Sequence, residues 1–450
     1  MPAPGLPGRV LRIIVISTKE YASPKVWGET RMRMTSYWAV AVLVGSLGCA
    51  SSDATDEAPP FQPLTGTLDQ VDQAVPGLSG SLAEDFEDGD LLFGTALRAG
   101  DGLGPLYTRS ACSSCHTSGV RGPGLVEKMS VVEADGVTPA ADQSMLAFGH
   151  TVHPLVVSRG ELPDPTPILP PRDQPRVKVT SRIGPAVIGR GYIEAIADSE
   201  IERVAAEQAE RSDEIHGQVN RVAYGSEPNI DTRFHNHQKG EIVIGRFGVK
   251  ARVATLDDFT ADAFQGDMGI TSPLRPTEFA NPDGLTDDGK PGVDVDYRSV
   301  NLRATYIRLL EIPKRTLSEQ GAELFAATQC ATCHVPALRT RADYPIAELA
   351  DIDAPVYSDL LLHRMGDELA DGLPAKMDID GEADSFEWRT APLIGLRFNR
   401  TFLHDGRAES IEEAVLLHRG EGSQANGSID LFEALSTDDR ASLLEFVEAL

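Results

Sequence analysis

One short motif, Cys-x-x-Cys-His, occurs twice in this chain of 450 residues and constrains its fold more than any other feature. It spans Cys112–His116 and again Cys330–His334. Two thiols at this spacing, followed at once by a histidine, are the attachment signature of c-type haem. A thioredoxin-like redox pair or half a zinc site are the alternatives, but zinc would need a second ligand pair at fixed spacing. We therefore expect two covalently attached haems, held by Cys112, Cys115, His116, Cys330, Cys333 and His334.

The chain has five cysteines, and the fifth, Cys49, follows the apolar stretch 38–48 near the N-terminus. Basic residues before that stretch complete the pattern of an export signal, and the cysteine resembles the attachment residue of a bacterial lipoprotein signal. Cleavage near Gly48 or Ala50 is the alternative and would release a soluble periplasmic protein. We predict that residues 1–48 are an export signal and that the protein is periplasmic or bound to the cell envelope. A lipid on Cys49 would be its only membrane attachment.

Composition along the chain predicts its domain organisation. Residues 49–80 are rich in Ser, Asp and Pro and are predicted to be a disordered tether. Beyond them, helical periodicity alternates with Pro/Gly-rich stretches, which predicts a mainly α, loop-rich fold. The cluster Asn281–Gly292 separates a predicted N-terminal haem domain, 81–290, from a C-terminal cytochrome c-like haem domain, 291–450. Its aspartates are candidate Ca²⁺ ligands, although they lack EF-hand spacing and such clusters usually form turns.

The formal net charge of the chain is −27. So strong an acidic balance disfavours nucleic acid and anionic membrane surfaces as partners. It suits a basic, soluble redox donor such as a small cytochrome c or a cupredoxin. A solvated acidic surface without a partner is the alternative.

Seven ordered segments, together with the two motifs, resemble the di-haem oxidoreductases of the DUF1111 type, which are relatives of bacterial di-haem cytochrome c peroxidase and of MauG. The resemblance implies two cytochrome c-like domains in series and redox chemistry in the periplasm, but it does not supply a substrate. A small-molecule oxidant or substrate is expected as a partner under the leading hypothesis below. The segments are Asp101–Pro105, Gly189–Ile196, Gly245–Ala251, Asp267–Ser272, Asp359–Gly366, Trp388–Leu393 and Phe402–Ala408.

The sixth ligand of each iron decides whether a haem relays electrons or binds a substrate. Ser410 and Glu413 form a capping box, and the helix they start places His418 on its apolar face. In the family that this chain resembles, the same position supplies the sixth ligand of the C-terminal haem. We assign His418 to this role opposite His334, with Met365 as the second choice. A hydrogen-bonded core histidine is the alternative.

No histidine is equally well placed for the N-terminal haem. His150 and His153 lie on a loop able to reach the iron, but each is also an ordinary loop residue. By resemblance, Glu194 is expected near an open site as a general acid and base. The alternative is that Glu194 belongs to a plain amphipathic helix.

Two arginines are candidate contacts of the haems. Arg246 is predicted to be a propionate contact or a cation of the haem pocket, or else a surface residue at a helix end. Arg407 is predicted to bind a haem propionate while Asp405 fixes its guanidinium, or else to form an ordinary surface pair with Asp405.

The leading hypothesis is a peroxidase-like di-haem oxidoreductase in which the C-terminal haem relays electrons to a reactive N-terminal haem. An electron carrier without catalytic activity and a di-haem oxygenase are the alternatives.

Overall fold

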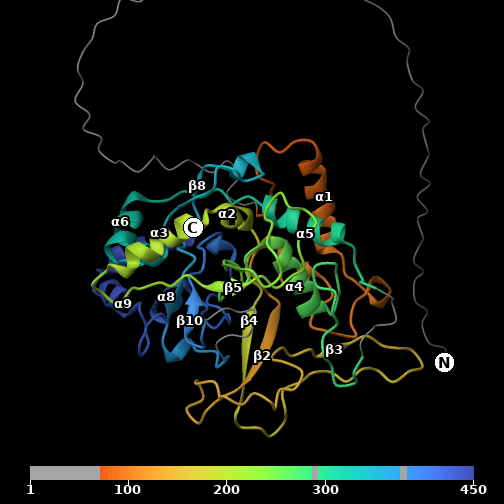
Figure 1. The fold of residues 1–450 in the computed structure, drawn as a ribbon. Helices are drawn as coiled ribbons and strands as arrows, with labels where there is room; N and C mark the ends of the chain where they lie inside the picture. Colours follow the sequence, from red (N-terminus) through yellow and green to blue (C-terminus); the bar gives the residue numbers. More distant parts are fainter. Residues whose placement is uncertain (1–70, 286–291, 375–382) are drawn as a thin grey trace, which may run out of the picture. The chain divides into compact units, whose positions relative to one another are not determined.

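In the computed structural model of this protein, residues 71–285, 292–374 and 383–450 are described (Figure 1). Several helices begin where the sequence supplies a side-chain cap: Thr255, Asp296, Ser318, Ser410 and Ser436 each accept a hydrogen bond from a backbone N–H three residues further on. The predicted cap at Ser410 is therefore confirmed. The helices are α1 (Ser81–Gly94), α2 (Arg190–Ala195), α3 (Asp198–Ala209), α4 (Leu256–Met268), α5 (Tyr297–Leu309), α6 (Glu319–Ala327), α7 (Cys330–Cys333), α8 (Ile411–Leu416), α9 (Asn426–Glu433) and α10 (Thr437–Ala449).

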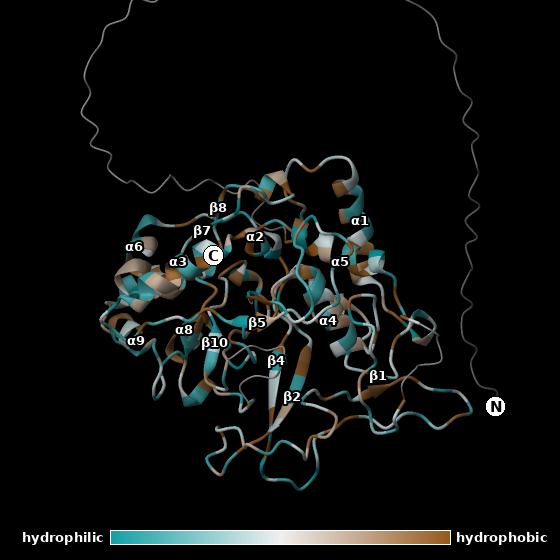
Figure 2. Ribbon diagram, viewed as in Figure 1, coloured by the Kyte–Doolittle hydropathy of each residue, from teal (hydrophilic) through white to brown (hydrophobic). Residues whose placement is uncertain are grey.

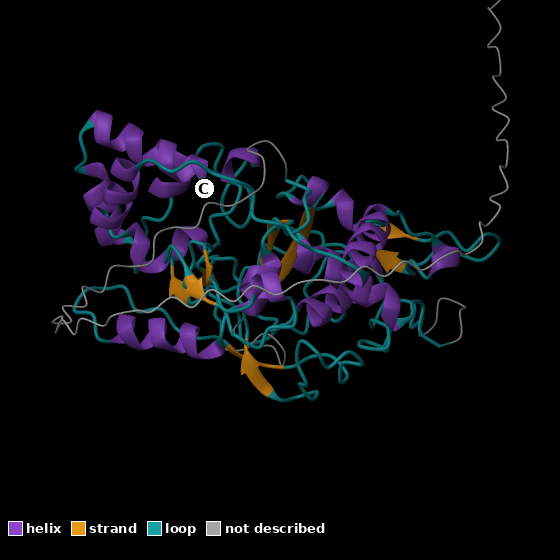
Figure 3. Ribbon diagram, turned by 90° about the horizontal axis from the view of Figure 1, so that it is seen from above, coloured by secondary structure: helices purple, strands orange, loops and turns teal. Residues whose placement is uncertain are grey.

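Small antiparallel sheets accompany the helices, each with two strands, in the order β1–β3, β2–β4, β5–β6, β7–β8 and β9–β10. The longest pair, β2 with β4, aligns Leu125 with Ile183 and Val131 with Val177. The fold is thus mixed and rich in loops, so a mainly α prediction missed the sheets (Figure 3). The strands are β1 (Leu106–Tyr107), β2 (Leu125–Val131), β3 (Leu155–Val156), β4 (Val177–Ile183), β5 (Arg221–Ala223), β6 (Ile242–Ile244), β7 (Leu338–Arg339), β8 (Asp353–Ala354), β9 (Leu362–Arg364) and β10 (Glu387–Arg389).

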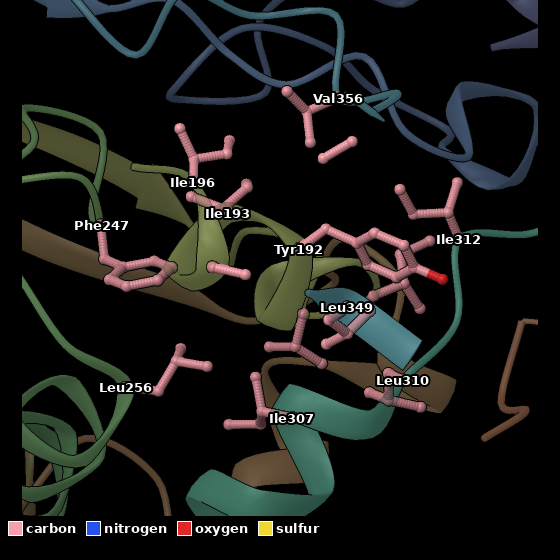
Figure 4. Packing of buried hydrophobic residues seen from close by; sticks show 14 of the residues in the cluster. Tyr192, Ile193, Ile196, Phe247, Leu256, Ile307, Leu310, Ile312, Leu349 and Val356 are labelled. Carbon is pink, nitrogen blue, oxygen red and sulfur yellow. The ribbon is translucent and has the colours of Figure 1, made fainter. Parts of the chain in front are cut away.

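The largest hydrophobic cluster packs α2 against α5 and the loops around them (Figure 4). Helix α1 also approaches α5 closely, because Gly89 faces it: a Cβ there would lie 2.5 Å from the Leu302 carbonyl oxygen. The cluster draws residues from Val75 to Ile394, on both sides of the predicted boundary at residue 290. That boundary lies outside the described residues, and the division into two haem domains stays a prediction.

A second cluster surrounds the C-terminal motif, where α6 packs against α10. Gly321 permits this contact, since a Cβ there would lie 2.3 Å from Cβ of Phe446. Helix α3 is amphipathic: it buries Ile201, Val204 and Gln208 on one face and presents hydrophilic residues elsewhere (Figure 2).

The described chain begins earlier than the predicted end of the tether. Val75 is buried and its N–H donates to the Leu309 carbonyl at 2.7 Å, while the Glu311 N–H donates to the Gln73 carbonyl at 2.8 Å. The chain is therefore bonded to the end of α5 at Gln73 and Val75, within the predicted tether, and the extent of the tether stays a prediction. The export signal, Cys49 and part of the candidate Ca²⁺ cluster lie outside the described residues. Within the described ranges, none of the helices is long and apolar enough to cross a membrane.

Candidate functional site

The first motif lies against one end of the antiparallel β2–β4 pair, where β2 begins and β4 ends. Gly124 precedes β2 and Gly184 follows β4, and both lie against Cys115. A Cβ on Gly124 would lie 2.5 Å from the Cys115 sulfur, and one on Gly184 would lie 2.6 Å from its carbonyl oxygen. Only glycine permits this approach, so the β2–β4 pair fixes the position of the Cys115 thiol.

His116 is oriented by the residue that follows Gly184. Its Nδ1 donates to the Pro185 carbonyl at 2.6 Å, which leaves Nε2 free to bind a metal. Burial lowers the pKa of His116 to about 4, so the imidazole is neutral at physiological pH. A neutral imidazole fixed through Nδ1 is the arrangement expected of an axial haem ligand.

His116, Cys112 and Cys115 open onto a pocket of about 890 Å³, its mouth included. Its walls are largely apolar and aromatic, it has a single carboxyl group, and His116 is the only imidazole among the described residues that line it. The aromatic residues are Phe93, Phe247, Phe259 and Phe264; the arginines are Arg109, Arg190, Arg246, Arg303 and Arg389; the carboxyl group belongs to Asp267.

Of the five pocket arginines, only Arg246 forms a salt bridge with a carboxylate among the described residues; Arg190 and Arg389 are two of the four that do not. Nε of Arg190 donates to the Ala186 carbonyl at 2.7 Å, and Nε of Arg389 donates to the Gly248 carbonyl at 2.9 Å. Burial lowers the pKa of Arg190 to about 9 and that of Arg389 to about 10. Buried cations need anionic partners. A flat apolar group that carries carboxylates, as haem does, fits a pocket with these walls, two thiols and an imidazole.

The Asp267 carboxyl lines the same pocket and forms no hydrogen bond or ion pair with another described residue. Burial raises the pKa of Asp267 to about 6. It is therefore a carboxyl group able to exchange protons near neutral pH.

Glu194 lies on α2 but does not line the pocket. Its carboxylate accepts from Nε of Arg308 at 2.6 Å, from the Leu256 N–H at 2.7 Å and from the Tyr344 hydroxyl at 2.8 Å. Burial favours a raised pKa, but Arg308 outweighs it and the pKa of Glu194 falls to about 2. The predicted acid–base role of Glu194 finds no support in this geometry, because the group stays ionised and fully occupied.

Arg246 does line the pocket, on the side of α2. Its NH1 donates to the carbonyls of Ile193, Glu194 and Ile196 at the end of that helix, and its NH2 pairs with Asp198. Its Nε is buried and has no hydrogen-bond partner among the described residues. Arg246 thus fixes the end of α2 and keeps one donor available, while its predicted haem contact stays a prediction.

The predicted loop ligands of the N-terminal iron point elsewhere. His150 donates through Nδ1 to the Met129 carbonyl at 2.9 Å. His153 is buried, and its Nε2 donates to the Gly266 carbonyl at 2.8 Å. Neither lines the pocket.

The second motif forms α7 and is oriented in the same way as the first. Gln329, just before it, adopts a left-handed φ of 62° that turns the chain into the motif. His334 donates through Nδ1 to the Tyr357 carbonyl at 3.1 Å. Burial, and then the neighbouring imidazole of His418, lower the pKa of His334 to about 4.

His418 therefore lies close enough to His334 to affect its titration. Nδ1 of His418 donates to the Ala414 carbonyl at 2.7 Å, which leaves Nε2 free, as in His334. The assignment of these two histidines to one haem stays a prediction. Met365 follows β9, and its carbonyl lies beside Gly420, two residues beyond His418, so it stays the second choice.

A buried His–Asp pair lies next to the second motif and was not predicted. His363 Nε2 donates to Asp359 at 2.8 Å, and its Nδ1 lies 3.8 Å from the Cys333 sulfur. These three side chains place ligand atoms within 4.8 Å of one another. If Cys333 carries a haem thioether, its thiolate is unavailable to another metal, so the cluster is a polar support for the haem site.

The predicted contact Arg407 lies at the surface. Its Nε donates to Asp405 at 2.6 Å and its NH1 to the Glu368 carbonyl at 2.7 Å. Asp405 therefore holds Arg407 as predicted, whereas the propionate contact stays a prediction. His404, just before them, stacks on Trp388 with ring centres 3.7 Å apart.

The pocket and the orientation of the two motif histidines suit a haem-binding protein. Comparison with known families gives the particular assignment: residues 172–450 match the family described as "Di-haem oxidoreductase, putative peroxidase". The chain belongs to this di-haem oxidoreductase family, as its resemblance predicted. The match includes the second motif, while the first precedes it.

Solved structures with weak overall likeness were also found. Hydrazine synthase of Kuenenia stuttgartiensis is 13% identical with a TM-score of 0.34, covering 90% of this chain and 100% of its own. A variant of the diheme peroxidase BthA of Burkholderia thailandensis is 13% identical with a TM-score of 0.34, covering 86% of this chain and 94% of its own. No curated protein sequence matches.

Proposed function

We propose that this chain is a periplasmic di-haem c-type oxidoreductase that reduces peroxide, in which a C-terminal haem relays electrons from a soluble donor to a reactive N-terminal haem. The observation that carries the proposal is the difference between the two motif sites. The imidazoles of His418 and His363 both act to lower the pKa of His334, whereas His116 is the only imidazole among the described residues of its pocket.

At the C-terminal site, His334 and His418 would bind the haem iron, and Cys330 and Cys333 would hold the porphyrin. Each imidazole is held by a carbonyl through Nδ1, so little reorientation of the side chains would be needed when the charge at the iron changes. A haem with two protein ligands would supply electron transfer rather than substrate binding.

At the N-terminal site, Cys112, Cys115 and His116 would hold the haem. A bound haem supplies one-electron redox chemistry and a metal position where peroxide can bind. Phenylalanines around it would exclude water, and the guanidinium groups of Arg190 and Arg389, which form no salt bridge with a carboxylate among the described residues, would bind its propionates. Asp267 holds or releases a proton within the same walls.

One observation favours the electron-carrier alternative. Met268, next to Asp267, also lines the N-terminal pocket, and a thioether can serve as a sixth ligand. Its side chain packs in a buried cluster with Phe264 and Leu274. We therefore assign it to the wall of the pocket.

Electron paramagnetic resonance of the oxidised holoprotein tests the proposal. We expect a high-spin signal from the N-terminal haem, in the resting or half-reduced state, beside a low-spin signal. His418→Ala should abolish the low-spin signal and reduce donor-driven peroxide consumption at least tenfold. Met268→Leu should leave both signals unchanged, and His150→Ala is the matched histidine control. Two low-spin haems in every redox state, or loss of a low-spin signal in Met268→Leu, would show an electron carrier instead.

A further inference from the structure

A buried histidine, His363, lies at the centre of a hydrogen-bond network beside the second motif. Its side chain is buried, and that of its partner Asp359 is fully buried. The Asp359 N–H donates to the Cys333 carbonyl at 2.8 Å. The His–Asp pair is therefore fixed to the motif by the main chain, in addition to the contact between His363 and the Cys333 sulfur.

Both ring nitrogens of His363 act as hydrogen-bond donors. Nε2 faces the Asp359 carboxylate at 2.8 Å, and Nδ1 faces Oε1 of Gln424 at 2.8 Å. The orientation of the Gln424 amide is fixed, because its Nε2 donates to the His216 carbonyl at 3.2 Å and its Oε1 accepts from the His216 N–H at 3.4 Å. The Asp359 carboxylate also accepts from Nε2 of Gln208 at 2.8 Å. His363 therefore joins two oxygen acceptors that lie far apart in the sequence.

The Asp359 end of this network holds the loop that orients His334. Tyr357, whose carbonyl accepts from Nδ1 of His334, has a left-handed φ of 50°, and Leu360 has one of 61°. Residues other than glycine rarely adopt this conformation, and it persists where surrounding contacts impose it. Asp359 lies between the two and supplies such contacts, since its N–H bonds to the motif and its Oδ1 accepts from the Leu361 N–H at 2.9 Å. Loss of these contacts would release the carbonyl that holds His334.

The Gln424 end of the network holds the segment that carries His418. The Gln424 N–H donates to the Arg364 carbonyl at 2.9 Å, and Oγ of Ser423 donates to the His418 carbonyl at 2.6 Å. Arg364 and His363 are neighbours on β9. The segment beyond His418 is therefore attached to β9 through the main chain of Arg364 and through the imidazole of His363.

We propose that His363 is a positioning residue of the C-terminal haem site, which links the segment carrying His418 to the loop that orients His334. This assignment rests on the proposed function, in which these two imidazoles bind the haem iron. Outer hydrogen bonds that orient the ligands of a metal strengthen its binding. Because the network fixes both segments, His418 competes well with external ligands, and the C-terminal haem keeps to electron transfer.

The space around the imidazole allows it to be displaced without changing its chemistry. Gly217 lies against the ring: a Cβ there would lie 2.8 Å from Cε1 and from Nε2 of His363, and 2.6 Å from Oε1 of Gln208. Gly217→Ala therefore disturbs the position of His363 while leaving its two acceptors, Asp359 and Gln424, in the chain.

Cyanide titration of the oxidised holoprotein, followed by electron paramagnetic resonance, tests the assignment. Cyanide that displaces His418 replaces the bis-histidine low-spin signal by the signal of a cyanide adduct. Loss of an outer hydrogen-bond partner weakens a metal site roughly 10–100-fold. His363→Phe should therefore lower the cyanide concentration needed at this haem by a factor in that range, and Gly217→Ala should lower it by less.

Two substitutions of Gln424 separate the hydrogen bond of His363 from general stability. Both lose the donor to the His216 carbonyl, so the two variants differ in the acceptor for Nδ1 of His363. Gln424→Glu keeps that acceptor and should titrate as wild type, whereas Gln424→Leu removes it and should follow His363→Phe. His153→Gln is the matched control, because it removes another buried imidazole, which donates to the Gly266 carbonyl, and it should leave the titration unchanged.

The outcomes separate the two proposals. Wild-type cyanide affinity in His363→Phe, Gly217→Ala and Gln424→Leu, together with loss of the low-spin signal in His418→Ala, would overturn the role of His363 alone. A low-spin signal that persists in His418→Ala would overturn the ligation by His418 and with it the electron-relay part of the proposed function. If His363→Phe takes up no haem, the Gln424 variants decide, and equal cyanide affinity in Gln424→Glu and Gln424→Leu would overturn the assignment.

Discussion

The two Cys-x-x-Cys-His sites carry the same motif in different surroundings. Both histidines donate Nδ1 to a carbonyl from a later loop, Pro185 for His116 and Tyr357 for His334. Around His116 lies a pocket rich in arginine, whereas around His334 lie an imidazole and a buried His–Asp pair. The motif therefore fixes where a haem is held, while residues distant in sequence determine what that haem can do.

The scaffolds behind the two sites also differ. Gly124 and Gly184, at one end of the β2–β4 pair, lie against Cys115. The C-terminal motif instead follows α6, which packs on α10. The N-terminal site is thus built from loops and strand ends that leave room for a pocket. At the C-terminal site the helices pack closely, and this suits a site closed by a side-chain ligand.

Removal of each cysteine pair should produce the largest effects and separate the two sites. Cys112→Ser with Cys115→Ser should reduce haem content from two to one per chain and abolish reaction with peroxide. Cys330→Ser with Cys333→Ser should also leave one haem, but binding of small iron ligands at the N-terminal site should persist while donor-driven turnover stops. The pyridine haemochrome assay measures haem content, and stopped-flow mixing measures ligand binding. Equal loss of ligand binding in the two variants would contradict the division of roles.

Glu194→Gln should have the next largest effect, on stability rather than on chemistry. Arg308 is fully buried and would keep only Asp257 as an ionised partner. Uncovering a buried charge costs roughly 3–5 kcal/mol, and we expect about 3 kcal/mol because Asp257 remains. Denaturant unfolding of the holoprotein gives the value, with Glu202→Gln on the exposed face of α3 as control.

The pH dependence of unfolding tests the same interaction. Glu194 has a pKa of about 2 in the folded chain against an ordinary value of 4.5. Its contribution is therefore complete above about pH 4.5 and is lost as the pH falls towards 2. The free energy of unfolding should decline less steeply in this window for Glu194→Gln than for wild type. A peroxide reaction rate that falls 100-fold in Glu194→Gln with unchanged stability would restore Glu194 as the catalytic acid–base.

Sequence could predict what short patterns encode. The two motifs and the cap at Ser410 follow from local spacing, and the family follows from the resemblance of ordered segments. The helix that starts at Ser410 ends at Leu416, so His418 follows the helix and the prediction that it lies on the apolar helical face was wrong. Arg190, Arg389 and Asp267 carry no such signal, because they meet only through the packing of α2, α4 and β10. All three residues lie within segments that matched the family, but nothing in those segments marks them as residues of one pocket.

Glu194 shows why the prediction of the catalytic carboxyl failed to find support. Its position in the sequence predicted that Glu194 lies near the first haem. The structure allows this, because Leu256 lines the pocket and its N–H donates to the Glu194 carboxylate. Its partner Arg308 lies on α5, more than a hundred residues away. Sequence spacing alone therefore cannot distinguish an ion-paired carboxyl from a reactive one.

Arg407→Gln should have the smallest effect and tests whether this loop takes part in either haem site. Its donors are used by Asp405 and by the Glu368 carbonyl, and its side chain is 38% exposed. Exposed ion pairs contribute about 0.2–1 kcal/mol, so we expect a loss of about 0.5 kcal/mol in unfolding free energy. Both haem midpoint potentials should stay within error of wild type in spectroelectrochemical titration, because Arg407 is not expected to touch either haem. Loss of a guanidinium that bound a propionate would change the charge beside that haem and shift its potential. A change in the midpoint potential of one haem alone would instead show that Arg407 binds the propionate of that haem. The two sites would then also differ in a cation supplied from the surface.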